Sequence, residues 1–240
     1  MQERKLRVGV NRLRNAYSVL TGTSFCYPKT IYTEHRLSFS QEGEDGILQR
    51  LFDRKPLGYY VDIGSHHPQR FSNTYLFYLR GWRGINIDPL PGSKARFDAS
   101  RQRDINLEVG ISDNPGQLVY YAFQEPALNT FDPDVAKNRG SVLISKTKIM
   151  VLRLRDVLDQ HMPINQKIDF LNIDVEGLDL QVLRSNDWSR YRPSYVLAEA
   201  LGMRDVYQVI ESDLHEYMIS VGYSFFAKCV NTLLFIDSRG

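Results

Sequence analysis

At 240 residues, the chain is long enough for one α/β domain with a substantial core and marginal for two. Its 42% hydrophobic and 24% charged residues are typical of a globular protein, and its net charge of +2 gives no basic field for nucleic acid. The two cysteines stand in no metal-ligand spacing, no apolar run has the ~18 residues of a membrane span, and no signal-peptide core begins the chain, so we expect a cytoplasmic protein.

Residues 1–39 predict a basic appendage to a single domain at 40–240. The first 20 residues contain one acid, Glu3, and five cations: Arg4, Lys5, Arg7, Arg12 and Arg14. A solvated helix or a frayed end explains this bias. The alternative is a surface helix that contacts an anionic membrane or a partner peripherally through residues 1–20.

From residue 38 onward, helix-like and strand-like segments alternate. Strands are predicted at 58–64, 83–89, 105–112, 116–123, 149–154, 167–177 and 194–200, with an antiparallel hairpin at 223–237. Helices are predicted at 38–52, 68–80, 92–103, 155–162, 178–185 and 204–222. Ser40 is the expected N-cap of the first helix, and Pro68 fits the first turn of the second. This order predicts an open, mostly parallel sheet with helices on both faces.

Two stretches need separate comment. The apolar run at 116–123 is expected to pair with the strand at 105–112 or to extend it. Residues 124–148 show no clean period, and irregular loops of that length inside a compact domain are uncommon and tend to be functional.

Acidic residues lie at the carboxyl ends of several predicted strands, where open α/β sheets bind their ligands. Asp62 ends the first strand and Asp88 the second, while Asp174 and Glu199 lie at the ends of two later strands. Capping of a following helix or turn would explain a single acid. Two acids that flank a helix between buried strands favour a function.

The turn after the first strand reads DIGSHHP and lacks the G-x-G-x-x-G pattern of a dinucleotide site. Asp62 would repel a phosphate, so a cationic ligand without phosphates fits better. S-adenosylmethionine is such a ligand. Asp88 is placed to accept hydrogen bonds from its ribose hydroxyls, and the helix after Gly64 offers amide groups to its carboxylate.

Four motifs in order, SQEGEDGIL, VDIGSHHP, SNTYLFYLRGWRGINIDP and IDVEG, resemble the FkbM family of S-adenosylmethionine-dependent methyltransferases over roughly residues 40–237. The resemblance implies the class I, Rossmann-like methyltransferase fold, with a seven-stranded sheet whose last strand is antiparallel. It also implies O-methylation of a hydroxyl on a sugar, a glycan or a glycosylated natural product. The residues that it assigns to the cofactor are Asp62, Gly64 and Ser65 in the turn, Asp88 at the ribose, and Gly110, Ile111 and Ser112 near the adenine.

Transfer of a methyl group to a hydroxyl needs a base that takes the proton, or a metal that acidifies the hydroxyl. Asp174 and Glu176 are two apart and face the same side of an extended chain. We expect one of them to be the general base or to orient a histidine base. The alternative is that both hold Mg²⁺, a hard cation that oxygen ligands satisfy. Asp179 is expected only to complement the next helix N-terminus.

Two adjacent histidines, His66 and His67, are further candidates for the base because histidine titrates near neutral pH. Hydrogen bonds that shape the turn are the alternative role for both. Asn73 and Thr74 follow the turn closely enough to face the acceptor, and Glu199 is placed to contact it.

Three other function classes compete with this interpretation. An NAD-dependent sugar-modifying enzyme lacks its glycine pattern here, and a nucleic-acid methyltransferase lacks a basic groove. A non-catalytic scaffold with a degenerate pocket is disfavoured by the intact series of strand-end acids. We therefore expect a small-molecule or glycan acceptor.

Overall fold

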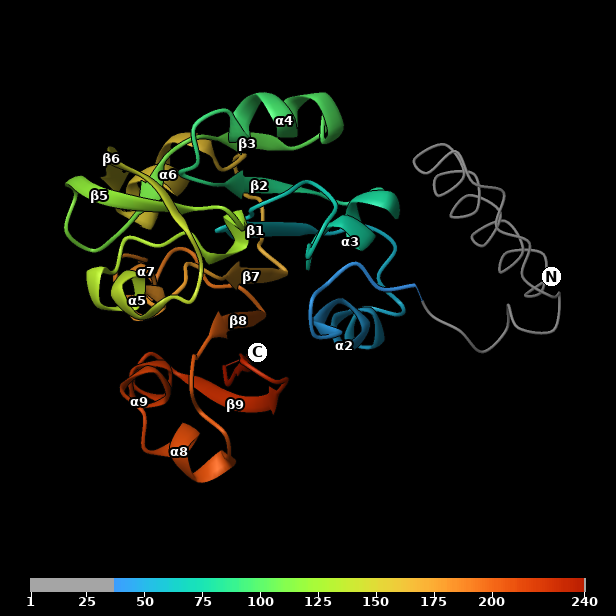
Figure 1. The fold of residues 1–240 in the computed structure, drawn as a ribbon. Helices are drawn as coiled ribbons and strands as arrows, with labels where there is room; N and C mark the ends of the chain where they lie inside the picture. The colour runs from blue at the N-terminus through green and yellow to red at the C-terminus, as the bar shows by residue number, and fades with distance from the viewer. Residues whose placement is uncertain (1–36, 240) are drawn as a thin grey trace, which may run out of the picture.

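The structure is a computed structural model, and it describes residues 37–239. The contact predicted for residues 1–20 therefore lies outside the described residues. The centre of the fold is a seven-stranded sheet with the strand order β3-β2-β1-β7-β8-β10-β9 (Figure 1). Its strands are β1 (Tyr59–Ile63), β2 (Arg83–Ile87), β3 (Ile105–Leu107), β7 (Phe170–Ile173), β8 (Tyr195–Glu199), β9 (Tyr223–Lys228) and β10 (Thr232–Asp237).

Five neighbouring strands of this sheet are parallel to one another: β3, β2, β1, β7 and β8. Strand β10 runs antiparallel to both of its neighbours, β8 and β9. This arrangement confirms the predicted fold class, a Rossmann-like α/β sheet with an antiparallel C-terminal hairpin. No helix among residues 37–239 is both long and apolar enough to cross a bilayer.

Helices cover both faces of the sheet because successive side chains along each strand point to opposite sides. Tyr60 packs with residues of α2 and α3, whereas Val61 packs with residues of α6, α7 and α9. The helices are α2 (Glu44–Leu51), α3 (Tyr75–Leu79), α4 (Ser93–Ser100), α6 (Leu154–His161), α7 (Asp179–Arg184), α8 (Val206–Ile210) and α9 (Asp213–Ser220). Strand β7 is buried along its whole length, as expected for the middle of a parallel sheet.

A second, three-stranded sheet corrects two strand predictions. It consists of β4 (Gly110–Ile111), β5 (Gly116–Phe123) and β6 (Leu143–Leu152), in the order β4-β6-β5. The strand predicted at 105–112 is split between the two sheets, and the run at 116–123 pairs antiparallel with β6 instead. Gly110 packs so closely that an added Cβ would lie 2.7 Å from Val151 and 2.8 Å from Phe131.

The stretch at 124–148 is not a structureless loop. It contains a 3₁₀ turn, η1 (Pro126–Leu128), a short helix, α5 (Pro133–Asn138), and the first half of β6. Residues 143–148 of β6 are exposed without alternation, which removes the period-two pattern by which strands are recognised.

Three helix predictions are also corrected. The predicted 204–222 helix breaks into α8 and α9, and the Ser212 hydroxyl caps α9 by accepting a hydrogen bond from His215 N (3.2 Å). The 68–80 helix begins only at Tyr75, because Phe71 takes a left-handed conformation (φ 57°) that interrupts a helix, so Pro68 lies outside it. Gly43, rather than Ser40, occupies the N-cap of α2.

Candidate active site

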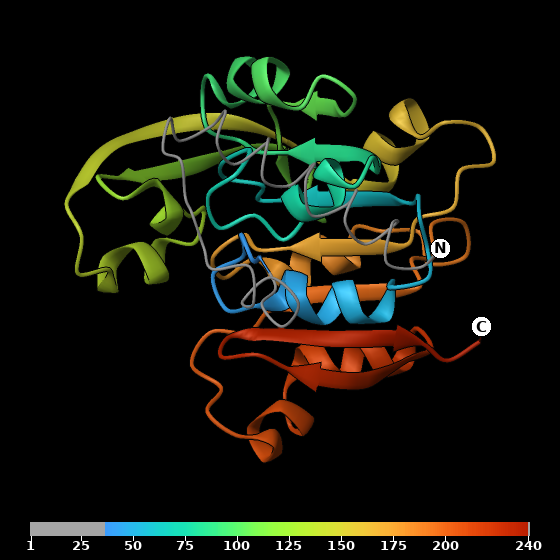
Figure 2. The ribbon, with the colours of Figure 1, turned by 90° about the vertical axis from the view of Figure 1, so that its right-hand side faces the viewer.

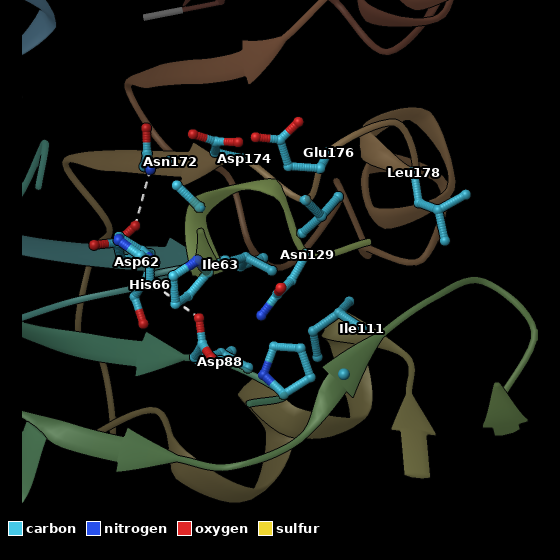
Figure 3. A pocket seen from close by; sticks show the side chains of 18 of the residues that line it. Asp62, Ile63, His66, Asp88, Ile111, Asn129, Asn172, Asp174, Glu176 and Leu178 are labelled. Atoms are coloured by element: carbon cyan, nitrogen blue, oxygen red, sulfur yellow. Dashed lines mark hydrogen bonds between the residues drawn. The ribbon is translucent and has the colours of Figure 1, made fainter. Parts of the chain in front are cut away.

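A cavity of about 840 Å³, counting the open space at its mouth, lies at the carboxyl ends of β1, β2 and β7 (Figure 3). Most of the residues that the sequence nominates line it: Asp62, Gly64, Ser65, His66, Asn73, Asp88, Gly110, Ile111, Asp174 and Glu176. Four nominated residues do not line it: His67, Thr74, Ser112 and Glu199. The parallel order of the strands thus brings acids that are 112 positions apart, Asp62 and Asp174, to one cavity.

Asp62 is held from two sides at the end of β1. Its Oδ1 accepts a hydrogen bond from Asn172 Nδ2 (2.8 Å), and its Oδ2 accepts one from Thr74 Oγ1 (2.8 Å). Burial raises the pKa of this carboxyl, and the two hydrogen bonds oppose that rise. Thr74 therefore lies behind Asp62, where it fixes the orientation of the carboxylate.

A buried arginine supports this arrangement from below. Arg101, which is 0% exposed, donates to Thr74 Oγ1 (3.1 Å) and to Ser72 Oγ (2.9 Å). It also donates to Tyr60 Oη (3.1 Å) and lies 3.6 Å from the buried carboxylate of Asp104. A buried cation is tolerated only when it is paired and hydrogen-bonded. Arg101 and Asp104 thus form a polar network behind the β1 side of the cavity.

Asp88 at the end of β2 is also fixed. Its Oδ2 accepts a hydrogen bond from His66 N (2.7 Å), and its Oδ1 accepts one from Leu90 N (2.9 Å). The residue is 5% exposed, and burial raises its pKa to about 6. Each carboxylate oxygen has two lone pairs, so Asp88 retains acceptor capacity toward the cavity.

The two histidines have different surroundings. His67 Nδ1 accepts hydrogen bonds from Gln69 N (3.1 Å) and Arg70 N (3.0 Å), which is the role of a turn cap. His66 lines the cavity in a left-handed conformation (φ 52°). Burial, with the charge of Arg70 adding to it, lowers the pKa of His66 to about 4, so its ring is neutral at physiological pH.

Three buried polar atoms that belong to cavity-lining residues have no hydrogen-bond partner among residues 37–239: Ser65 Oγ, His66 Nε2 and Asn73 Oδ1. The other end of the Asn73 amide is fixed, because its Nδ2 donates to Asn172 Oδ1 (2.8 Å). An unsatisfied buried polar group is costly, and a bound ligand is one way to satisfy it.

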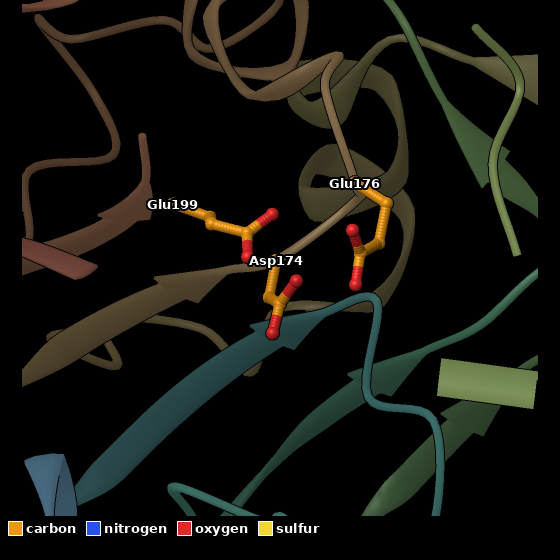
Figure 4. Close-up of side chains that lie close together, drawn as sticks. All are labelled: Asp174, Glu176 and Glu199. Atoms are coloured by element: carbon orange, nitrogen blue, oxygen red, sulfur yellow. The ribbon is translucent and has the colours of Figure 1, made fainter. Parts of the chain in front are cut away.

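The opposite side of the cavity carries three carboxylates that crowd together (Figure 4). Asp174, Glu176 and Glu199 each offer an oxygen, and these oxygens lie within 4.8 Å of one another. Burial raises the pKa of Glu176 and Glu199, and enclosure by the cavity walls raises that of Asp174 although its side chain is open to the solvent there. Repulsion among the three raises the pKa of Asp174 and Glu199 further. Glu199 thus joins the other two without lining the cavity itself.

The neighbours of these carboxylates differ. Glu176, in a left-handed conformation (φ 57°), forms an ion pair with Arg139, which follows α5. Asp174 is reached by solvent through the cavity, and its carboxylate accepts no hydrogen bond from residues 37–239. Asp179 accepts hydrogen bonds from Gly177 N (3.4 Å) and Glu199 N (3.2 Å), and burial raises its pKa to about 7. Asp179 therefore joins the ends of β7 and β8, besides lying in the first turn of α7 as expected.

Gly64 has a packing role as well as a place in the turn. Its φ is 76°, and an added Cβ would overlap the carbonyl oxygen of Asp174. A side chain at this position would therefore push the β1 turn away from the end of β7.

Sequence reasoning missed several residues at the site. Asn172 is the one polar side chain within the apolar strand β7, and that position was a signal that could have identified it. Arg101 and Arg139 gave no such signal, because each lies in a polar stretch. The segment from β5 to α5 contributes further lining residues: Tyr120, Pro126, Ala127, Asn129 and Phe131.

Comparison with protein families identifies a methyltransferase domain. The profile of the methyltransferase FkbM domain matches residues 62–225, which include every residue nominated for the site. A comparison with curated proteins found no significant match. The match covers more than half of the chain and agrees with the sheet order and with the cavity at the strand ends. The chain therefore belongs to the FkbM family of methyltransferases.

Proposed function

We propose that this protein transfers a methyl group from S-adenosylmethionine to a hydroxyl of a sugar, a glycan or a glycosylated natural product. The assignment of S-adenosylmethionine as the cofactor is supported by one observation: a single cavity combines unsatisfied polar atoms with an acidic lining. Ser65, His66 and Asn73 supply the unsatisfied atoms, and Asp62 and Asp88 supply the buried acids. A cationic ligand rich in polar groups and free of phosphate suits such a lining.

The residues present fit the cofactor in the following way. Asp88 would accept hydrogen bonds from the ribose hydroxyls, since its backbone donors leave lone pairs free. Ser65 and Asn73 would satisfy their unpaired oxygens on the amino-acid part of the cofactor. Gly110 and Ile111, which line the cavity beyond β2, are the proposed surroundings of the adenine, and Ser112 would support that turn from outside the cavity.

The cofactor, when bound, supplies the electrophilic methyl group. The chain must then hold the acceptor hydroxyl in line and remove its proton. Asp174 is the proposed base, because it faces the cavity, accepts no hydrogen bond from the described residues, and has a raised pKa that improves its affinity for a proton. Glu176 is held by Arg139 and is proposed to position the acceptor, together with Glu199.

A divalent cation is the alternative at the same place. The oxygens of Asp174, Glu176 and Glu199 are close enough to one another to hold one ion, and Mg²⁺ accepts carboxylate ligands of this kind. Such an ion would relieve the repulsion that raises the pKa of Asp174 and Glu199. Calorimetry in the presence and absence of Mg²⁺ distinguishes a bare base from a metal centre.

The test of the proposed function is titration of the full chain with S-adenosylhomocysteine by calorimetry. We expect saturable binding in the micromolar range. The control variant is Asp53→Asn, which changes an exposed carboxylate just after α2, and it should bind like the wild type. Absence of binding by folded wild-type protein would refute the cofactor assignment.

A further inference from the structure

The strands β5 and β6 form an antiparallel ribbon with two unlike faces. The inner face carries Tyr120 and Ile149, which pack with Phe131 next to the cavity. The other face, here called the outer face, points away from this cluster and consists of Gln117, Val119, Tyr121, Ile144, Lys146, Lys148 and Met150. In Figure 2 the ribbon extends to the left, the side to which the arrowheads of the parallel strands point. The ribbon therefore lies at the end of the sheet where the cavity opens.

Apolar side chains at the start of β6 and on the outer face are unusually exposed. Val142 is 64% exposed, Ile144 67% and Met150 52%. Within residues 37–239, the edge of β6 away from β5 is also unpaired from Leu143 to Met150, because β4 pairs only with the two residues that follow. Adjacent exposed apolar residues of this kind mark an interaction site.

The charged residues between Asp134 and Asp156, a stretch of the chain that includes all of β6, are all positive. No acid occurs between Asp134 and Asp156 in the chain. The same interval contains six cations: Lys137, Arg139, Lys146, Lys148, Arg153 and Arg155. Lys146 and Lys148 lie side by side between Ile144 and Met150 on the outer face, so the lysine stems can lie along apolar material while their ammonium groups reach anions.

Charge complementarity decides between the possible occupants. In a second copy, antiparallel pairing of the free edge with itself, centred on Lys146, would place Lys146 directly against Lys146 of that copy, which is unfavourable. Residues 1–36 carry seven Lys or Arg and two Glu, so this part of the chain is repelled as well. A surface that is apolar inside and anionic at its boundary matches both features of the outer face.

We propose that the outer face of the β5–β6 ribbon, together with Val142 and Leu143, docks onto an anionic membrane surface and brings the cavity to an acceptor carried on a lipid. The part of this proposal that concerns an acceptor carried on a lipid rests on the proposed function. The connection between β5 and β6 supports this part of the proposal, because it links the ribbon directly to the cavity. It supplies Asn129 to the cavity wall and Arg139 to the ion pair with Glu176. A hydroxyl on a glycolipid headgroup would then reach the carboxylates at the interface.

The experiment is sedimentation of the full chain with phosphatidylcholine vesicles, with and without phosphatidylglycerol. We expect binding that depends on phosphatidylglycerol. Replacement of both exposed aliphatic residues in Val142→Ser/Ile144→Ser, or of both lysines in Lys146→Ser/Lys148→Ser, should weaken it roughly tenfold. The matched control is Ile164→Ser, because Ile164 is 93% exposed and precedes β7, at the amino ends of the parallel strands and away from the cavity. This variant should bind like the wild type.

Three results would overturn the proposal. The first is that the wild type fails to bind anionic vesicles. The second is that both ribbon variants bind as the wild type does, so that the basic residues at 1–20 account for all binding. The third is that Ile144→Ser converts a dimer into a monomer in sedimentation velocity, which would assign the face to a second copy. Titration of the same variants with S-adenosylhomocysteine separates this proposal from the proposed function. Loss of vesicle binding with unchanged cofactor binding concerns the ribbon alone.

Discussion

The two sides of the cavity hold their carboxylates in different ways. At the ends of β1 and β2, Asp62 and Asp88 each accept two hydrogen bonds from fixed donors. At the ends of β7 and β8, Glu176 accepts one from Arg139, while the side chains of Asp174 and Glu199 accept none from residues 37–239. Fixed carboxylates bind a ligand in one geometry. Crowded carboxylates that repel one another take up a proton or a cation. The difference therefore suggests that one side binds and the other reacts.

The largest expected effect comes from removing the proposed base. Asp174→Asn should lower kcat by roughly 10²- to 10⁴-fold, the range that general bases contribute, while cofactor affinity stays within a few-fold of wild type. The measurement is transfer of a labelled methyl group to an acceptor selected from sugar and glycan libraries. Asp53→Asn, which changes the exposed carboxylate just after α2, is the matched control. Wild-type turnover in Asp174→Asn would move the chemistry to Glu176 or His66.

The next effect concerns the network behind the binding side. Arg101→Met should cost about 3–5 kcal/mol of unfolding free energy, because Asp104 would become an unpaired buried charge. Urea denaturation measures it. Arg83→Met, which changes an exposed arginine at the start of β2, should alter stability by less than about 0.5 kcal/mol. Equal stability of the two variants would mean that Arg101 is not needed to hold this side together.

A smaller effect is expected from the hydroxyl that links this network to Asp62. Thr74→Val keeps the shape but removes the donor to Asp62 and the acceptor for Arg101, so we expect a loss of about 1–3 kcal/mol. Thermal unfolding should show a lower Tm, whereas Thr147→Val, at an exposed position of β6, should not. A Tm for Thr74→Val equal to that of the wild type would contradict the positioning role of Thr74.

The smallest effect is a pH dependence of binding. Hydrogen bonds from ribose hydroxyls favour ionised Asp88, whose pKa is raised to about 6, so affinity for S-adenosylhomocysteine should fall as pH drops below about 6. The fall should not exceed about tenfold per pH unit, as for one proton. In Asp88→Asn this component should vanish. An affinity that stays constant through this range in the wild type would mean that Asp88 does not contact the ligand.

The acids at the strand ends could be predicted because each follows a buried apolar run, and a parallel sheet brings such ends to one edge. Asp62, Asp88 and Asp174 were identified in this way. Arg101 could not be, since its complete burial depends on Tyr60, Ser72 and Thr74, which are distant from it in the chain. From the local sequence, Arg101 is indistinguishable from the other cations of a polar predicted helix.

The strand β5 was predicted with its observed bounds, but its pairing with β6 and the first half of β6 were not, for a related reason. A strand exposed on both faces has no alternating pattern, and β6 shows this from Leu143 to Lys148. The break between α8 and α9 was missed because Val206, Val209 and Leu214 satisfy a helical period across it, although a serine cap interrupts the backbone at Ser212. Local hydrogen bonding overrode periodicity there.

The most direct test of the division between the two sides is calorimetric titration of Asp88→Asn and Asp174→Asn with S-adenosylhomocysteine, beside the wild type. The account predicts that Asp88→Asn binds about ten- to a hundredfold more weakly, as expected for hydrogen bonds to a charged acceptor worth about 1.5–3 kcal/mol, and that Asp174→Asn binds like the wild type. Equal losses in both variants, or a loss in Asp174→Asn alone, would contradict it.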